Sequence, residues 1–371
     1  MSQEPTPIDE VFDEHVDALN PVFHVLGHYG GRYPVVLTLG LITGSVAPLL
    51  SLVPAYLIGV ITDALVSGPT AYTLPLVPAR YIPDALGGQL LLTLGILTAS
   101  TVISLGARTA DSMLWDWLQH NAIHDIRVDA YDATQRLGME FFTTAQTGDV
   151  LSVLAEDVDQ LEGVFGRWIK QSLSITLMLV GMFAIMLGMN WQLATVSILL
   201  ILPQAVIWIV FDTVVTDRFL NVRTEYGQFF TRVENALSGI KTVKLNARED
   251  FERSRVERSS STFLDKFLWI IRIRAVFYPT DRLLASLNTV AVFTIGGWTA
   301  LFGPPHPYFA PISVGTFVTF FMYSRRFGWQ LRGVSWIIDT YNEVYASGQR
   351  VFGLVHHPTT VEEAENPVPL E

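Results

Sequence analysis

Residues 171–211 read QSLSITLMLVGMFAIMLGMNWQLATVSILLILPQAVIWIVF and contain no charged side chain. A helix that spans the hydrocarbon core of a bilayer needs about 20 apolar residues, so this run is long enough for two such helices. Gly188-Met189-Asn190-Trp191 interrupts it near the middle with residues typical of a turn. The stretch therefore predicts two membrane-spanning helices joined by a tight hairpin.

Three other charge-free runs, 33–62, 85–107 and 283–324, repeat this pattern along the chain. The last run contains GPPHP at 303–307, through which no helix can continue. We therefore expect an all-α membrane protein in which Pro48 and Pro54 kink the first span and Pro203 the fourth. The six predicted spans are about 34–66, 85–110, 168–188, 191–213, 281–302 and 311–332.

Composition excludes several classes of protein. The 371 residues are 50% hydrophobic and 16% charged, against about 25% charged for a soluble domain, so a soluble enzyme of this length is excluded. The absence of cysteine excludes a disulfide scaffold, thiol catalysis and cysteine metal sites. The first residues, MSQEPTPIDEVFDEH, have no basic region before a short apolar core, so we expect an acidic tail at 1–19 and no cleaved signal peptide.

Basic residues predict the orientation in the membrane. Of the 24 Lys and Arg, five lie in 108–170, thirteen in 212–282 and four after residue 324. The connections on the opposite side carry only Arg80. Because basic residues favour cytoplasmic loops, both termini and both long segments should be cytoplasmic, in a multi-pass protein of the cell membrane. The excess of 35 acidic residues, with only four Lys among the cations, suits either a halophilic prokaryote or a GC-rich genome.

The two long cytoplasmic segments, 108–170 and 212–282, have the spacing of helices. Apolar residues recur at three- and four-residue intervals. They are Ile123, Ile126, Ala130, Ala133 and Leu137 in the first segment and Phe229, Val233, Ala236, Leu237 and Ile240 in the second. Two helices of about 30 residues joined by a bend would project roughly 45 Å from the membrane.

Near the two bends the sequence resembles the transmembrane domain of ABC exporters. The first bend carries IRVDAY at 126–131, QRLGMEFF at 135–142, TGDVL at 147–151 and DVDQL at 157–161, and the second carries ENALSGIKTVK at 234–244. Downstream, ISVG at 312–315 and ASGQRVF at 346–352 resemble the start and the exit of the sixth helix. The resemblance extends from about residue 20 to the end of the chain.

This resemblance implies a type 1 (type IV) exporter fold that forms a domain-swapped homodimer or heterodimer. Each bend would be a coupling helix that transmits the closure of an ATPase domain to the membrane. The residues at these positions are Met139, Glu140, Phe141, Phe142 and Gly148 in the first bend, and Gly239, Lys241, Thr242, Lys244 and Arg248 in the second. In the first, Phe141 and Phe142 would form the apolar contact, although the same pair is also compatible with the core of a helical hairpin.

The sequence shows no ATPase motif. A P-loop needs a lysine directly after a glycine, and Lys170, Lys241, Lys244 and Lys266 all follow other residues. Leu237-Ser238-Gly239 begins like the LSGGQ signature of the family but continues with Ile240-Lys241. We therefore expect that this chain is not an enzyme by itself. Residues 20–350 would be the transmembrane domain and 351–371 a linker toward a nucleotide-binding domain.

The family resemblance also implies the partners and the substrate cavity. ATP and Mg²⁺ would bind the ATPase domain, and the partners would be that domain or subunit, a second transmembrane subunit and the bilayer, with no nucleic acid. The candidate cavity residues are Phe293, Trp298, Phe317, Phe320, Phe321, Tyr323, Arg325 and Arg326. Arg325 and Arg326 would either meet an anionic headgroup or extend to lipid phosphates. Asp63, Asp212 and Asp281 are expected at the membrane interface.

Two further patterns have a structural explanation. His120 and His124 lie four residues apart, but no third metal ligand accompanies them, so no metal site is expected. Gly40 and Gly44 form a G-x-x-x-G pattern that lets two helices approach closely, most simply within the chain.

The sequence thus predicts the substrate-translocating part of an ATP-driven exporter that moves a hydrophobic or amphipathic molecule by alternating access. The alternative is a membrane scaffold or regulatory protein that kept the fold and lost the motor. An ion channel is disfavoured because no line of polar residues runs through the spans.

Overall fold

The computed structural model describes residues 20–357, apart from 76 and 146. The predicted acidic tail at 1–19 and most of the predicted linker, 358–371, lie outside the described residues. Regular structure in the described part is helical throughout, which confirms the all-α prediction. The chain forms two compact units: Met1–Ile185 with Trp329–Glu371, and Met186–Gly328.

The first unit begins with short helical elements and two apolar helices. These are α2 (Pro21–His24), η2 (Val25–Tyr29), η3 (Gly30–Arg32), α3 (Pro34–Leu50), α4 (Val53–Ser67), η4 (Pro69–Ala71) and η5 (Ala79–Tyr81). The predicted span 34–66 is therefore divided at Ser51 and Leu52. Pro54 lies in the first turn of α4, where its missing N–H is not needed, so the expected kink is a break between two helices.

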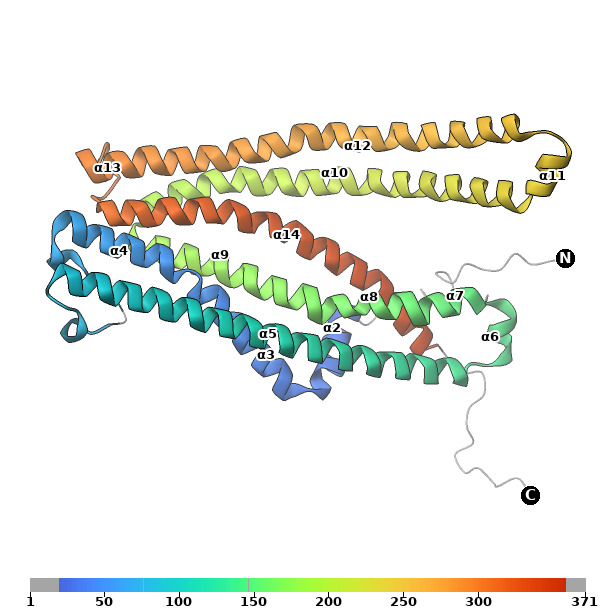
Figure 1. Cartoon of the computed structure of the whole chain (residues 1–371), viewed down its shortest axis with the longest axis horizontal. Coiled ribbons are helices and arrows are strands. Elements are labelled where there is room, and N and C mark those ends of the chain that lie inside the picture. The colour runs from blue at the N-terminus through green and yellow to red at the C-terminus, as the bar shows by residue number, and fades with distance from the viewer. Residues whose placement is uncertain (1–19, 76, 146, 358–371) are drawn as a thin grey trace, which may run out of the picture. The chain divides into compact units, whose positions relative to one another are not determined.

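The next helix, α5 (Leu86–Arg136), runs without a break for 51 residues, or about 77 Å. A short helix, α6 (Met139–Thr144), follows it, and the chain returns through α7 (Thr147–Ser152), η6 (Val153–Asp157), α8 (Val158–Gly163), η7 (Val164–Ile169) and α9 (Lys170–Met189). Figure 1 shows α5 and this returning limb joined at α6. The predicted helical excursion with one bend is thus present.

The core of the first unit joins segments that are distant in sequence. Buried members include Val22 near the N-terminus, Leu118 and Ile126 of α5, Phe165 of the returning limb and Leu354 near the C-terminal end of α14 (Val314–Val355). Their apolar surface is removed from water together, which stabilises the association of these four segments.

The glycine pattern of α3 lies against α5, as expected for packing within the chain. A Cβ atom at Gly44 would lie 2.8 Å from Oδ1 of Asp111, and one at Gly40 would lie 3.2 Å from the Trp115 ring. Glycine at both positions lets the Asp111 and Trp115 side chains lie directly against the backbone of α3.

The second unit is built around a long helical hairpin. Its elements are α10 (Trp191–Ser238), α11 (Ile240–Leu245), α12 (Glu249–Ala291), η8 (Val292–Gly296) and α13 (Gly297–Phe302), followed by the first part of α14. The predicted turn at 188–191 is confirmed, and Asn190 caps α10 by accepting a hydrogen bond from the backbone N–H of Leu193 at 2.8 Å. Pro203 lies inside α10, and that helix continues past it.

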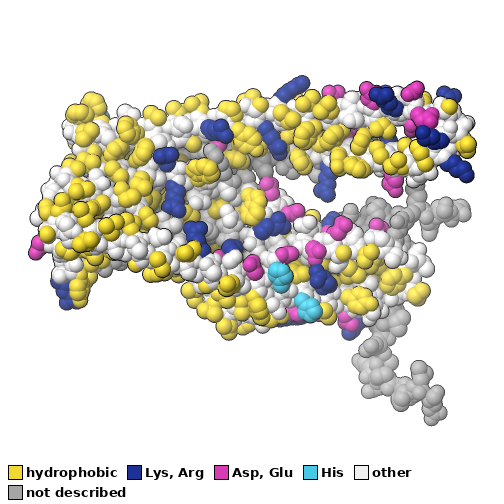
Figure 2. All heavy atoms as spheres, viewed as in Figure 1, with side chains coloured by type: hydrophobic (Ala, Val, Ile, Leu, Met, Phe, Trp, Pro, Cys, Tyr) yellow, Lys and Arg dark blue, Asp and Glu magenta, His cyan; other side chains and the backbone are white. Residues whose placement is uncertain are grey.

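The hairpin of α10 and α12 changes character along its length. Side chains of α12 pack on α10, and Figure 2 shows charged side chains gathered toward the α11 end. Among the described residues, five helical segments are long and apolar enough to cross a membrane: Pro34–Ser67, Leu86–Arg136, Thr147–Met189, Trp191–Val215 and Glu249–Phe302. The predicted sixth span lies in α14, which begins after the expected break at Gly303 and is not among those five.

Candidate functional site

The first bend presents one aromatic ring outward and buries the other. Phe141 is buried in the core of the first unit, 5.3 Å from the His357 ring, whereas Phe142 is 42% exposed. Met139 beside them is 78% exposed. Met139 and Phe142 therefore lie on the outer surface of α6, while Phe141 fixes the helix to the unit. Gly148 follows in α7 with open space around its Cα, and the side chain of Glu140 lies outside the described residues.

The second bend is short and exposed. Gly239 ends α10, and a Cβ there would lie 3.2 Å from the carbonyl oxygen of Asn235. Leu245 is 78% exposed at the end of α11. Lys244 forms an ion pair with Glu249 at 3.4 Å, and the Arg248 backbone N–H donates to Val243 at 3.0 Å.

The remaining residues predicted for the second coupling helix, Lys241 and Thr242, are exposed on α11. The structure thus brings all five predicted residues of this bend into one short segment. It offers a partner a surface of two exposed apolar side chains, Ile240 and Leu245, among basic ones.

A buried carboxylate in the first unit holds the end of α14. Asp157 accepts a hydrogen bond from the Ser347 hydroxyl at 3.0 Å and from Nε of Arg350 at 2.7 Å. A second guanidinium nitrogen of Arg350 also contacts this carboxylate. The pair is bidentate, and this geometry makes a charge-assisted bond specific. It connects the limb that returns from the first bend to the helix that precedes the predicted linker.

A histidine cluster lies at the same end of the first unit. His24 and His28 stack with ring centroids 5.5 Å apart, and the His356 ring lies 6.0 Å from His24. They line a cavity of about 360 Å³ that also receives the following residues from the two ends of the unit and from α5: Tyr29, Asp129, Asp132, Ala133, Arg136, Val355 and His357. Burial lowers the pKa of His24, and the neighbouring His28 and His356 lower it further. Burial, together with the nearby Asp129, raises the pKa of Tyr29.

The predicted cavity residues all lie in the second unit but do not form one cluster. Phe293, Phe317 and Phe321 form a ring cluster with centroid separations of 5.6 to 6.4 Å. The Arg325 guanidinium lies 6.0 Å from the Phe321 ring. Phe320 and Tyr323 are fully buried, and Trp298 is 54% exposed beside Phe302. Arg326 is half-buried.

The sequence did not distinguish Asp281 from other acidic residues at span ends. In the structure its carboxylate is 2% exposed and accepts hydrogen bonds from Nε2 of Gln204 at 2.7 Å and from Nε1 of Trp208 at 2.9 Å. Gln204 and Trp208 lie one turn apart on α10, and this i, i+4 pair of donors opposite an acidic residue was the available signal. Asp281 is therefore a buried polar link between α10 and α12.

The architecture of long helices with two short bends agrees with the comparison of the sequence with known families. A family model described as the ABC transporter transmembrane region matches residues 34–331. The chain belongs to this family. The match contains both bends, the aromatic ring cluster and Asp281. The protein is thus a multi-pass membrane protein with the membrane region of an ABC transporter.

The names of similar proteins refer to ATP binding, to a permease or to dependence on ATP. An uncharacterized ABC transporter ATP-binding protein of Bacillus subtilis is 24% identical over 65% of this chain and 40% of its own length. A fatty acid ABC transporter ATP-binding/permease protein of Mycobacterium bovis is 23% identical over 66% of this chain and 38% of its own. An ATP-dependent lipid A-core flippase of Vibrio cholerae is 24% identical over 66% and 41%. The chain thus matches about two fifths of the length of these relatives.

Proposed function

We propose that this ABC transporter membrane region is the substrate-translocating part of an ATP-driven exporter that works by alternating access. The observation that carries the proposal is the pair of bends, each at the far end of long helices. Phe142 at the first bend and Leu245 at the second are among the exposed apolar side chains that would meet an ATPase domain. Continuous helices such as α5 would carry a displacement of the bends to the membrane spans.

The ATPase domain, the second membrane subunit and the substrate class follow from this assignment. ATP and Mg²⁺ would bind an ATPase domain of the same longer protein or of a separate subunit, and a second membrane subunit would complete the cavity. The substrate would be hydrophobic or amphipathic. The ring cluster of Phe293, Phe317 and Phe321 supports this class, and so do the fatty acid and lipid A-core named for two relatives.

The test uses the complete transporter with its ATPase domain in liposomes, and a fluorescent fatty acid as the transport probe. Phe142→Ala and Leu245→Ala should each reduce ATP-dependent transport by about tenfold, the size of a typical coupling between two sites. Basal ATP hydrolysis should persist. Met113→Ala is the matched control, because Met113 is 67% exposed on the side of α5 and lies outside the residues of the first bend.

The outcomes separate the alternatives. Transport that is unchanged in both bend variants would contradict the coupling role and favour a scaffold that has lost its motor. A transporter that hydrolyses ATP but never moves the fatty acid would contradict the substrate class. The coupling role would then be tested by comparing ATP hydrolysis in the bend variants and in the unmodified transporter.

A further inference from the structure

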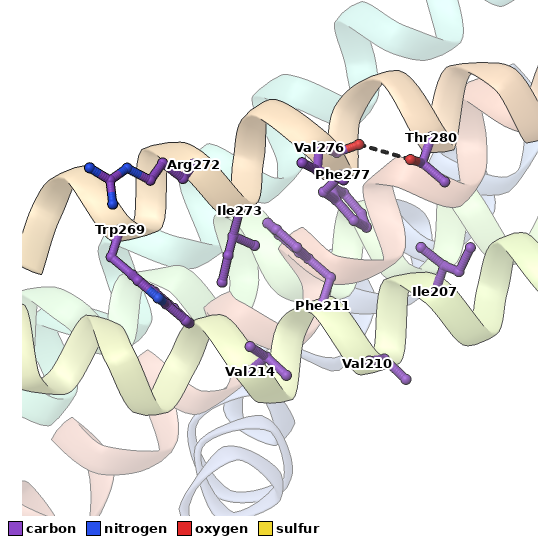
Figure 3. A pocket seen from close by; sticks show the side chains of 10 residues that line it. All are labelled: Ile207, Val210, Phe211, Val214, Trp269, Arg272, Ile273, Val276, Phe277 and Thr280. Atoms are coloured by element: carbon purple, nitrogen blue, oxygen red, sulfur yellow. Dashed lines mark hydrogen bonds between the residues drawn. The ribbon is translucent and has the colours of Figure 1, made fainter.

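A groove on the α10–α12 hairpin, within the second unit, has no role in the function proposed above. Its volume is about 680 Å³. Phe211 and Phe277 point toward each other between the two helices and stack with centroids 3.6 Å apart (Figure 3). The other lining residues are Ile207, Val210 and Val214 from α10 and Trp269, Arg272, Ile273, Val276 and Thr280 from α12. The wall is therefore almost entirely apolar.

This groove lies at the cytoplasmic edge of two predicted spans. Its α10 residues, 207–214, come from the end of the predicted span 191–213, and its α12 residues, 269–280, directly precede the predicted span 281–302. Both helices belong to segments that contain a candidate span. Val210 is 55% exposed and Val276 is 70% exposed. Open apolar side chains at the membrane boundary are compatible with contact to acyl chains, whereas in water a patch of this size would mark a binding surface.

One end of the groove is polar. A second cavity of about 370 Å³ adjoins it, lined by Arg218, Asn221, Asp265, Lys266 and Trp269. Trp269 lines both cavities, and the Arg218 guanidinium lies 4.8 Å from its ring centroid. Arg272 extends to the same Trp269 end (Figure 3). The hairpin thus offers an apolar channel that ends beside two guanidinium groups and an indole ring.

The charges at this end are not all neutralised. Lys266 is paired with Glu225, and Asp265 is exposed at the rim. In the part of the chain that the structure describes, Arg218 and Arg272 form no ion pair. A guanidinium presents several N–H donors in a planar fork that matches a phosphate group. Tryptophan is enriched at the depth of lipid headgroups.

We propose that this groove binds one anionic phospholipid from the surrounding bilayer. The phosphate would lie at Arg218 and Arg272, and an acyl chain would follow the wall formed by Phe211, Phe277 and Val214. The predicted orientation makes this a lipid of the cytoplasmic leaflet. The lipid is a bound component of the hairpin, so the site does not depend on the transport reaction.

The first test compares retention of phosphatidylglycerol and phosphatidylcholine with identical acyl chains on the full chain, by native mass spectrometry from detergent. Phosphatidylglycerol should be retained at about tenfold higher occupancy. The double variant Arg218→Gln, Arg272→Gln should remove this preference and leave the weaker retention of phosphatidylcholine unchanged. Arg258→Gln, an exposed cation of α12 outside both cavities, is the control and should keep the preference.

A second pair of variants tests the apolar wall. Val210→Trp would fill the groove and should reduce retention of both lipids severalfold, whereas Val206→Trp, 57% exposed on the same helix but outside the lining, should not. Equal retention of the two lipids by the unchanged protein, or equal loss in the arginine variant and its control, would overturn the proposal. So would lipid loss that follows dimer formation, because a second copy of the chain would then cover the groove.

Discussion

At the scale of single residues, Asp157 connects distant parts of the first unit, because it contacts Arg350 across 193 positions of sequence. Its carboxylate is 5% exposed. Removing the guanidinium would leave a buried charge with fewer donors. We expect Arg350→Gln to destabilise the folded protein by about 1–2 kcal/mol, measured as a lower midpoint of thermal unfolding in detergent.

The control for this prediction is an exposed pair of the same chemistry. Arg127 and Asp159 lie 2.7 Å apart with half or more of each side chain accessible. Arg127→Gln should therefore change the free energy of unfolding by less than about 0.5 kcal/mol. Equal effects of the two substitutions would show that the Asp157 pair contributes no more than a surface ion pair.

The histidine cluster makes a pH-dependent prediction. Burial and the neighbouring His28 and His356 lower the pKa of His24 below its ordinary value of 6.5. The N-terminal segment 20–29, which carries His24, docks on the end of α14, where the His24 ring lies 4.8 Å from the Phe352 ring. Because docking lowers the pKa of His24, the docking free energy is complete above pH 6.5. It weakens as the pH falls below that value, because the undocked segment binds the proton more readily. Asp129, Asp132 and Arg136 from α5 also line this cavity. The prediction attributes the effect of lower pH to the positive charge that His24 gains on protonation.

Because the chain has no cysteine, spin labels at Gly27→Cys and Asn342→Cys report this docking directly. The distance distribution should widen between about pH 7.5 and pH 5.5. His24→Gln should remove the pH dependence, and His120→Gln, a histidine of α5 outside the cluster, should retain it. A distribution that is insensitive to pH in the unmodified protein would contradict the prediction.

At the scale of elements, the helices and their ends were largely predictable. Proline, glycine and asparagine at 188–191 and 303–307 end helices for local reasons, and such reasons are visible in sequence. The burial of particular side chains could not be predicted in the same way. Phe141 and Phe142 differ by about 100° around α6, and only the direction in which α6 lies on the first unit decides which ring is buried. Asp281 likewise needed the partner helix to bring Gln204 opposite to it.

The packing of α3 on α5 gives a prediction at this scale. A Cβ atom at Gly44 would lie 2.8 Å from Oδ1 of Asp111, so a larger side chain would have to displace this buried carboxylate, which pairs with Lys170 at 3.4 Å, or the helix itself. Gly44→Val should therefore cost about 2–3 kcal/mol, the usual effect of overpacking, and reduce the yield of folded protein in size-exclusion chromatography. Gly95→Val is the matched control, since a Cβ atom added to Gly95 on α5 would meet nothing within 4 Å. A folded yield equal to that of the control would contradict the proposed contact.

At the scale of the whole molecule, what remains to be tested is how often the chain crosses the membrane. Arg325 and Arg326 lower the apolar character of α14, so this helix is absent from the five candidate spans. Its amino-terminal part nevertheless contains Phe317, Phe320 and Phe321, and basic residues near the cytoplasmic end of a span can extend to lipid phosphates. The distribution of Lys and Arg predicts that both termini are cytoplasmic. Termini on the same side of the membrane require an even number of crossings.

Single cysteines placed in the naturally cysteine-free chain can decide this. Pro305→Cys, in the exposed turn before α14, should react with a membrane-impermeant maleimide added outside intact cells. Asn342→Cys, ten residues beyond the predicted end of the sixth span, and Leu245→Cys, on α11, should react only after the membrane is opened. A permeant maleimide supplies the control for side-chain accessibility. If Pro305→Cys and Asn342→Cys react from the same side, α14 does not cross the bilayer, and the family's six-helix arrangement would have to be abandoned for this chain.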